Sequence, residues 1–120
     1  MFKIKSFYYA FKGIADLFSG RHPNAMIHLL AVVTVSTIGI FIGLSAVEWC
    51  IIVLCFVLVI SLEAVNSSIE YIVDLVSPGY HPLAGKAKDM AAAAVLLAAI
   101  STVIIATVIF IPKFINIIQS

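Results

Sequence analysis

Charged residues are scarce in this 120-residue chain: Asp, Glu, Lys and Arg together make up 11% of it, against 63% hydrophobic residues. The mean hydropathy is +1.20. A soluble domain needs more charged surface than this, so the composition excludes a soluble fold and indicates a small polytopic membrane protein. The net charge of +1 says little about partners, and no nucleic acid is expected among them.

Cysteine is scarce as well. Cys50 and Cys55 are the two in the chain, and they lie five residues apart in an apolar stretch. They are interpreted as packing residues in preference to a disulfide or a metal pair. The chain also lacks internal repeats and low-complexity linkers, so residues 1–120 are expected to form a single integral-membrane domain.

Long apolar runs account for most of the remaining sequence. One extends from Ala25 to Val47, interrupted only by His28, and another from Met90 to Ile111; a third begins at Trp49. Each is near the roughly 20 residues that a helix needs to cross a bilayer. The sequence therefore predicts an all-α membrane protein with three transmembrane helices, at about 25–47, 49–76 and 89–112.

The first 21 residues show a different pattern. Apolar side chains recur at helical spacing, and lysines lie off that stripe, which predicts an amphipathic helix lying in the membrane interface. A signal peptide is less favoured, because no uninterrupted apolar core or small-residue cleavage site follows the basic start. The stripe consists of Ile4, Phe7, Tyr8, Phe11, Ile14, Ala15 and Phe18.

Basic residues are distributed unequally between the two sides of the three expected spans. Six of the seven fall before the first span or between the second and third, and only Lys113 follows the third. This bias places the N-terminus in the cytoplasm of a multi-pass protein. The loop expected from Ser77 to Lys88 then faces the cytoplasm, where ATP is found.

Four polar side chains interrupt the second apolar segment at helical intervals. Glu63, Asn66, Glu70 and Asp74 have offsets of 0, +3, +7 and +11, so they fall within roughly 80° of one another on a helix. Carboxylates inside a membrane are costly unless they are paired, hydrated or bound to a cation, so they indicate function. A divalent cation, a basic side chain or both would relieve their repulsion.

A Gly-containing basic segment follows this polar stripe. Pro78 and Gly79 are expected to end the helix, and His81, Lys86 and Lys88 supply donors beyond it. The segment is not a Walker loop, because the glycine spacing is wrong and Ala87 stands where Ser or Thr would hold magnesium. Carboxylates, a cation and basic donors at a membrane surface suit phosphoryl transfer.

The run from Glu63 to Asp74, followed by Ala87-Lys88-Asp89, resembles the signature of the prokaryotic diacylglycerol kinase and undecaprenol kinase family. The resemblance covers nearly the whole chain. It implies a homotrimeric helical bundle in the bacterial inner membrane. It also implies that the γ-phosphate of MgATP is transferred to the hydroxyl of a membrane lipid, diacylglycerol or undecaprenol, at the cytoplasmic face.

The resemblance also implies roles for individual residues. Glu63 matches the general base, Glu70 a ligand of magnesium and ATP, and Asn66 an active-site support. The implied ATP contacts are Tyr9, Glu70, Asp74, Gly79, His81, Lys88 and Asp89.

One position departs from the family pattern. His22 stands two residues before Asn24, where the family usually has a second magnesium-binding Glu. Imidazole is a poor magnesium ligand. Three possibilities follow: Glu70 holds the metal with phosphates and water, another acid such as Asp16 helps, or activity is altered. A Glu at position 22 is expected to improve the metal site.

Two other functions fit intramembrane carboxylates. A small proton-coupled transporter or channel subunit would use them near the membrane midplane, and an assembly subunit would use them without catalysis. The lipid kinase is favoured because the polar stripe lies at one end of its span, beside the basic segment.

Overall fold

The structure, a computed structural model, describes residues 3–120, so residues 1–2 of the expected N-terminal helix lie outside the described part. Residues 3–120 form four α-helices and no strand: α1 (Ile4–Leu17), α2 (Pro23–Ile42), α3 (Ala46–Val76) and α4 (Pro82–Gln119). The last three are long and apolar enough to cross a membrane. The predicted all-α membrane fold is thereby confirmed.

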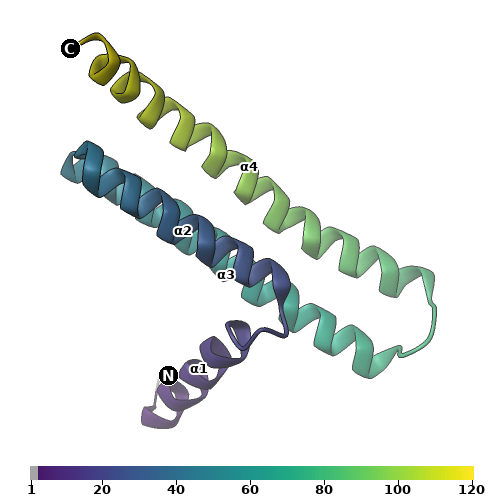
Figure 1. Cartoon of the computed structure of the whole chain (residues 1–120). Helices are drawn as coiled ribbons and strands as arrows, with labels where there is room; N and C mark the ends of the chain where they lie inside the picture. Colours follow the sequence, from purple (N-terminus) through teal and green to yellow (C-terminus); the bar gives the residue numbers. More distant parts are fainter. Residues whose placement is uncertain (1–2) are drawn as a thin grey trace.

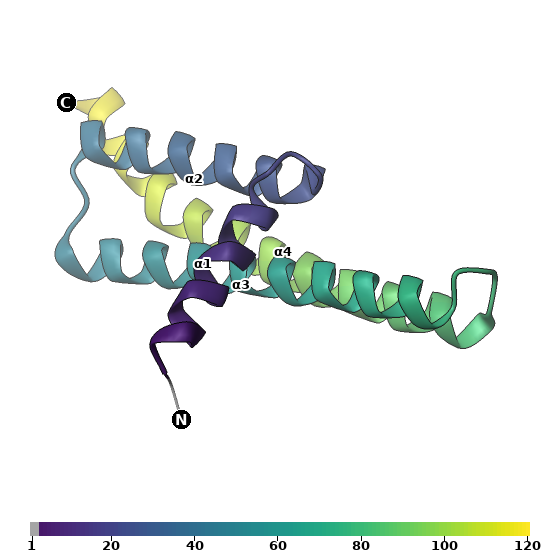
Figure 2. The same ribbon diagram turned by 90° about the horizontal axis from the view of Figure 1, so that it is seen from below.

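The three long helices differ in length, and this difference positions the site. α2 has 20 residues, α3 has 31 and α4 has 38, or about 30, 46 and 57 Å at 1.5 Å per residue. Only α2 matches the roughly 30 Å hydrocarbon core of a bilayer. Figure 2 shows α3 and α4 continuing together past the start of α2 to the turn that joins them. That end of the pair therefore extends beyond the apolar layer.

α1 lies across the long helices, with its N-terminal end directed away from them (Figures 1 and 2). Leu17, its last residue, is buried, whereas Phe7, Phe11 and Ile14 are more than half exposed. The helix thus presents an apolar side that a membrane interface would cover. The helix ends at Leu17 and not at residue 21, as the sequence suggested. The chain turns at Ser19 instead of continuing the helix, and the Ser19 hydroxyl donates to the Asp16 carbonyl oxygen at 2.6 Å.

The opposite end of the bundle is fixed by local sequence. Gly43 ends α2 with a φ of 85°, which favours glycine. Ser45 then starts α3 with a capping box: its hydroxyl accepts from the Glu48 amide at 3.2 Å, and the Glu48 carboxylate accepts from the Ser45 amide at 2.9 Å. Lys113 of α4 contacts the same carboxylate at 3.0 Å. The apolar core lies next to this end, around Ile52, Phe56 and Phe110.

Further boundaries differ from the sequence-based expectation: α2 spans Pro23–Ile42 instead of about 25–47, and α4 spans Pro82–Gln119 instead of about 89–112. The segment from Ser77 to Lys88 was expected to be a loop, but α4 already begins at Pro82. Proline is well suited to the first helical turn, and His81 caps the helix by accepting the Leu83 amide on Nδ1 at 3.1 Å. The loop is therefore limited to residues 77–81, and Lys86, Lys88 and Asp89 lie on α4.

Candidate functional site

Three buried polar side chains of α3 lie on the polar stripe, within about one turn of each other. Glu63, Asn66 and Ser67 are 3%, 4% and 5% exposed. Glu63 Oε2, Asn66 Oδ1 and Ser67 Oγ have no hydrogen-bond partner among residues 3–120. Buried polar atoms are nearly always paired in folded proteins. Three unpaired atoms in a row indicate a surface built to meet a polar ligand.

Glu70 lies two turns beyond Glu63 on the same side of α3. It is partly exposed and accepts a long hydrogen bond from the Asn66 amide at 3.4 Å. No group of three or more His, Cys, Asp or Glu side chains is gathered for a metal within residues 3–120. Magnesium is usually held by one or two carboxylates together with waters and substrate phosphates, and Glu70 fits that mode of binding.

The turn between α3 and α4 gathers four of the expected ATP contacts. The Lys88 ammonium donates to the Asp74 carboxylate at 2.6 Å across the two helices. Asp74, Gly79, His81 and Lys88 all line one depression of about 190 Å³. The geometry thus brings these residues together at the end of the bundle that extends beyond the apolar layer.

Three expected ATP contacts lie away from this depression: Tyr9, Asp89 and Glu70, which is not among its lining residues. Asp89 is exposed on α4 and is not among the residues that line it. Tyr9 lies on α1 and is 63% exposed, and its ring meets Tyr8 edge-to-face at a centroid distance of 5.4 Å. A single chain therefore does not bring Tyr9 and Asp89 into the group formed around Asp74 and Lys88.

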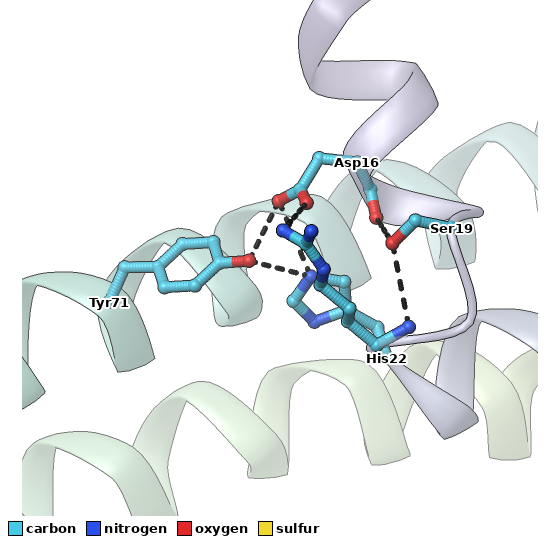
Figure 3. Close-up of polar contacts among 5 residues, drawn as sticks. Asp16, Ser19, His22 and Tyr71 are labelled. Atoms are coloured by element: carbon cyan, nitrogen blue, oxygen red, sulfur yellow. Dashed lines mark hydrogen bonds and ion pairs between the residues drawn. The ribbon is translucent and has the colours of Figure 1, made fainter.

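A hydrogen-bonded cluster joins α1, α2 and α3 where α2 begins (Figure 3). The Tyr71 hydroxyl donates to Asp16 Oδ2 at 2.7 Å. Because its proton is used there, its oxygen accepts from His22 Nε2 at 3.0 Å. Arg21 contacts the other Asp16 oxygen at 3.4 Å. The hydrogen bond from Tyr71 is the main cause of a pKa of Asp16 below its ordinary value, and His22 and Arg21 act in the same direction.

This cluster determines what His22 does in the structure. Its Nε2 is 3.5 Å from Asp16 Oδ2 and is bonded to Tyr71, so that nitrogen is not available to a metal. A carboxylate placed at position 22 would face the Asp16 carboxylate, and like charges at this distance repel. Whether a Glu at position 22 improves the metal site stays a prediction, which a magnesium titration of His22→Glu against wild type and His22→Ala would test.

Sequence reasoning did not identify Tyr71, and it considered Asp16 only as a substitute metal ligand. The available signal was weak: Tyr71 follows Glu70 directly and lies outside the polar stripe. Asp16, His22 and Tyr71 of this cluster line a groove of about 350 Å³ between α1 and α3. Its lining includes small residues on both helices: Ala10, Gly13, Ala64, Ser67 and Ser68.

Replacing Tyr71 with Phe is expected to loosen α1 from the bundle. The substitution removes both hydrogen bonds of the hydroxyl and leaves Asp16 and His22 without their shared partner. Hydrogen–deuterium exchange in bilayer nanodiscs should become faster in α1 and stay unchanged in the middle of α4. Tyr80→Phe is the matched control, since Tyr80 is 94% exposed. Equal α1 exchange in both variants would show that the cluster does not hold α1.

Comparison with known proteins gives one consistent family. The sequence pattern described as "Prokaryotic diacylglycerol kinase" matches residues 8–110. The chain is 41% identical to an undecaprenol kinase of Bacillus subtilis over 91% of this chain and 88% of that protein. It is 39% identical to a diacylglycerol kinase of Synechocystis, over 92% of this chain and 63% of that protein.

A diacylglycerol kinase of Escherichia coli is 36% identical over 84% of this chain and 82% of that protein. The matched region contains α2, α3 and most of α4, and with them the polar stripe and the turn beyond it. The chain therefore belongs to the prokaryotic diacylglycerol kinase family and is an enzyme of the lipid-kinase type.

Proposed function

We propose that this protein transfers the γ-phosphate of ATP, with Mg²⁺, to the primary hydroxyl of a membrane lipid of the diacylglycerol or undecaprenol type. The reaction takes place at the cytoplasmic face of the bacterial inner membrane, and the N-terminus lies on that side. The observation that carries this proposal is the Glu63 carboxylate, which is 3% exposed and whose Oε2 has no hydrogen-bond partner among the described residues.

The depth of Glu63 suits a lipid kinase. Glu63 is 17 residues from Ala46, the first residue of α3, or about 26 Å along the helix axis. In an apolar layer of about 30 Å this is close to the far boundary and well past the midplane. A lipid hydroxyl resides near such a boundary. A proton-coupled transporter, the alternative, is expected to place its acids near the midplane.

The nucleotide is proposed to bind farther along the same helix. Asp74, Gly79, His81 and Lys88 surround one depression outside the apolar layer. Lys88 and the other basic donors would contact phosphate oxygens, and Glu70 would hold Mg²⁺ between these residues and Glu63. Mg²⁺, when bound, neutralises charge that develops on the phosphates. Asn66 donates to Glu70 and so orients that carboxylate.

Glu63 acts as the general base in this scheme. The proton of the lipid hydroxyl passes to the Glu63 carboxylate, and the hydroxyl oxygen forms a bond to the γ-phosphorus. The bond between that phosphorus and the bridging oxygen breaks, which releases ADP. A carboxylate that is 3% exposed, with one oxygen that makes no hydrogen bond among the described residues, can act as a base shielded from water.

Label transfer from ATP tests the proposal. The purified protein in nanodiscs is given γ-³²P-ATP and Mg²⁺ with diacylglycerol, with undecaprenol, or with a lipid that lacks a free hydroxyl. Label is expected on at least one of the two lipid alcohols and not on the third lipid, and omission of Mg²⁺ should abolish transfer. Proton flux through sealed vesicles without any label transfer would favour the transporter instead.

We further propose that the active sites form between copies in a homotrimer. The depression at the α3–α4 turn is about 190 Å³, whereas sites for ligands of drug size are usually about 300–1,000 Å³. Tyr9 and Asp89 also lie apart from it. A second copy would complete the walls around the nucleotide.

Mixing two inactive variants should therefore restore activity. Glu63→Gln and Lys88→Ala are each expected to be inactive alone, and mixed trimers would contain an intact site if Glu63 of one copy works with Lys88 of another. Label transfer by the coexpressed pair is the measurement, with Glu63→Gln coexpressed with itself as the control. Absence of recovery in mixed oligomers that are shown to form would rule out shared sites.

A further inference from the structure

His28 of α2 faces Glu63 of α3 inside the apolar layer. His28 Nε2 is 3.8 Å from Glu63 Oε2, which is the oxygen without a hydrogen-bond partner among the described residues. The two side chains are 19% and 4% exposed. His28 lies five residues into α2, or about 7.5 Å from its start, so the pair is located just inside the membrane boundary.

The rest of the environment of His28 is apolar. Its side chain lines a cavity of about 250 Å³ between α2, α3 and α4, among residues such as Val32, Phe56 and Ile60. His28 is the one ionisable side chain among the described residues that line this cavity. Thr102 also lines the cavity, but its hydroxyl donates to the Ala98 carbonyl oxygen at 2.9 Å.

An imidazole at this depth is costly unless it has a polar partner, and an apolar side chain of similar size would pack there without that cost. The only carboxylate that it approaches within 4 Å in residues 3–120 is Glu63. Contact distances around a reacting group also tend to shorten when the substrate binds. The polar group that His28 can interact with inside the apolar layer is therefore the Glu63 carboxylate.

We propose that His28 is a positioning residue for Glu63. The 3.8 Å contact between Nε2 and Oε2 would shorten to a hydrogen bond when the substrate binds, which would orient the carboxylate and leave its other oxygen to accept the proton of the lipid hydroxyl. His28 keeps its own proton throughout, so the atoms and charges of the transfer are unchanged from those given above. This inference rests on the proposed role of Glu63 as the base.

Two substitutions at position 28 separate a positioning role from simple packing. His28→Phe keeps a ring and removes the donor, and it should fold, because it takes a polar group out of an apolar layer. His28→Gln restores a side-chain N–H donor at about the reach of Nε2. We expect kcat to fall by about 10–100-fold in His28→Phe, the range seen when a group that orients a working ligand is lost. KM for ATP should not change.

His28→Gln should keep kcat within a few-fold of the wild-type value, since its side-chain amide can donate to Oε2 in the proposed role. Thr102→Val, on the wall of the same cavity, is the matched control and should keep wild-type kcat. A His28→Phe variant with kcat within about twofold of wild type, which is the ordinary scatter of independent sites, would overturn the proposal. So would a His28→Gln variant as impaired as His28→Phe.

The double variant His28→Phe/Glu63→Gln tests independently whether His28 acts through Glu63. If His28 acts through Glu63, His28→Phe should change the residual kcat of Glu63→Gln by less than about twofold. A full multiplicative loss in that background would mean that His28 acts by another route. If Glu63→Gln alone keeps wild-type kcat, the proposed base is wrong. If Glu63→Gln is inactive and His28→Phe is fully active, only the role of His28 is wrong.

Discussion

Glu63→Gln is expected to lower kcat for lipid phosphorylation by about 10²–10⁴-fold, the usual contribution of a positioned base. Gln keeps the size and shape of the side chain and loses its basicity. Oε2 of Glu63 makes no hydrogen bond among residues 3–120, so a change at that oxygen removes none. KM for ATP should stay near the wild-type value, because the expected nucleotide contacts lie farther along α3 and α4.

The measurement is label transfer from ATP under saturating lipid, together with thermal unfolding in the same nanodiscs. Unfolding at the wild-type temperature would show that the loss is chemical. A Glu63→Gln enzyme that retains most of its kcat would contradict the assignment of Glu63 as the base. That result would favour a role of the polar stripe in assembly.

Glu70→Ala is expected to raise the Mg²⁺ concentration needed for half-maximal activity by about 10–100-fold, or to remove activity, by analogy with the loss of groups that support metal sites. Glu70 accepts a hydrogen bond from the Asn66 amide at 3.4 Å. It lies seven residues from Glu63, or roughly 10 Å along the axis, which leaves room for a phosphoryl group between the two carboxylates.

The matched control is Glu48→Gln, which removes a charge from the opposite end of α3, where Glu48 pairs with Lys113 at 3.0 Å. A magnesium titration of both variants and wild type separates a metal role from a general effect of charge. If Glu70→Ala titrates like wild type while Glu48→Gln also does, Glu70 does not hold the metal.

Local sequence was sufficient for the membrane fold and for the polar stripe. Three apolar runs predicted the three long helices, because length and hydrophobicity decide whether a helix can cross a bilayer. The intervals among Glu63, Asn66, Glu70 and Asp74 placed them on one side of α3, because a helix has a fixed angular period. The start of α4 was missed, because Pro82 and the His81 cap outweighed the glycine and the charges that suggested a longer loop.

The side-chain contacts between helices could not be predicted from the sequence. Tyr71 meets Asp16 across 55 positions and His22 across 49, and His28 meets Glu63 across 35. In a membrane protein, nearly all outward positions are apolar, so periodicity does not show which side of α2 packs on α3. The sequence by itself determined the three candidate spans, the family and the carboxylates that are proposed to carry the chemistry. Only the packing of α1 and α2 against α3 decided that His22 is tied to Tyr71 and that His28 faces Glu63, because side-chain pairing depends on helix rotation and depth, which tertiary contacts set.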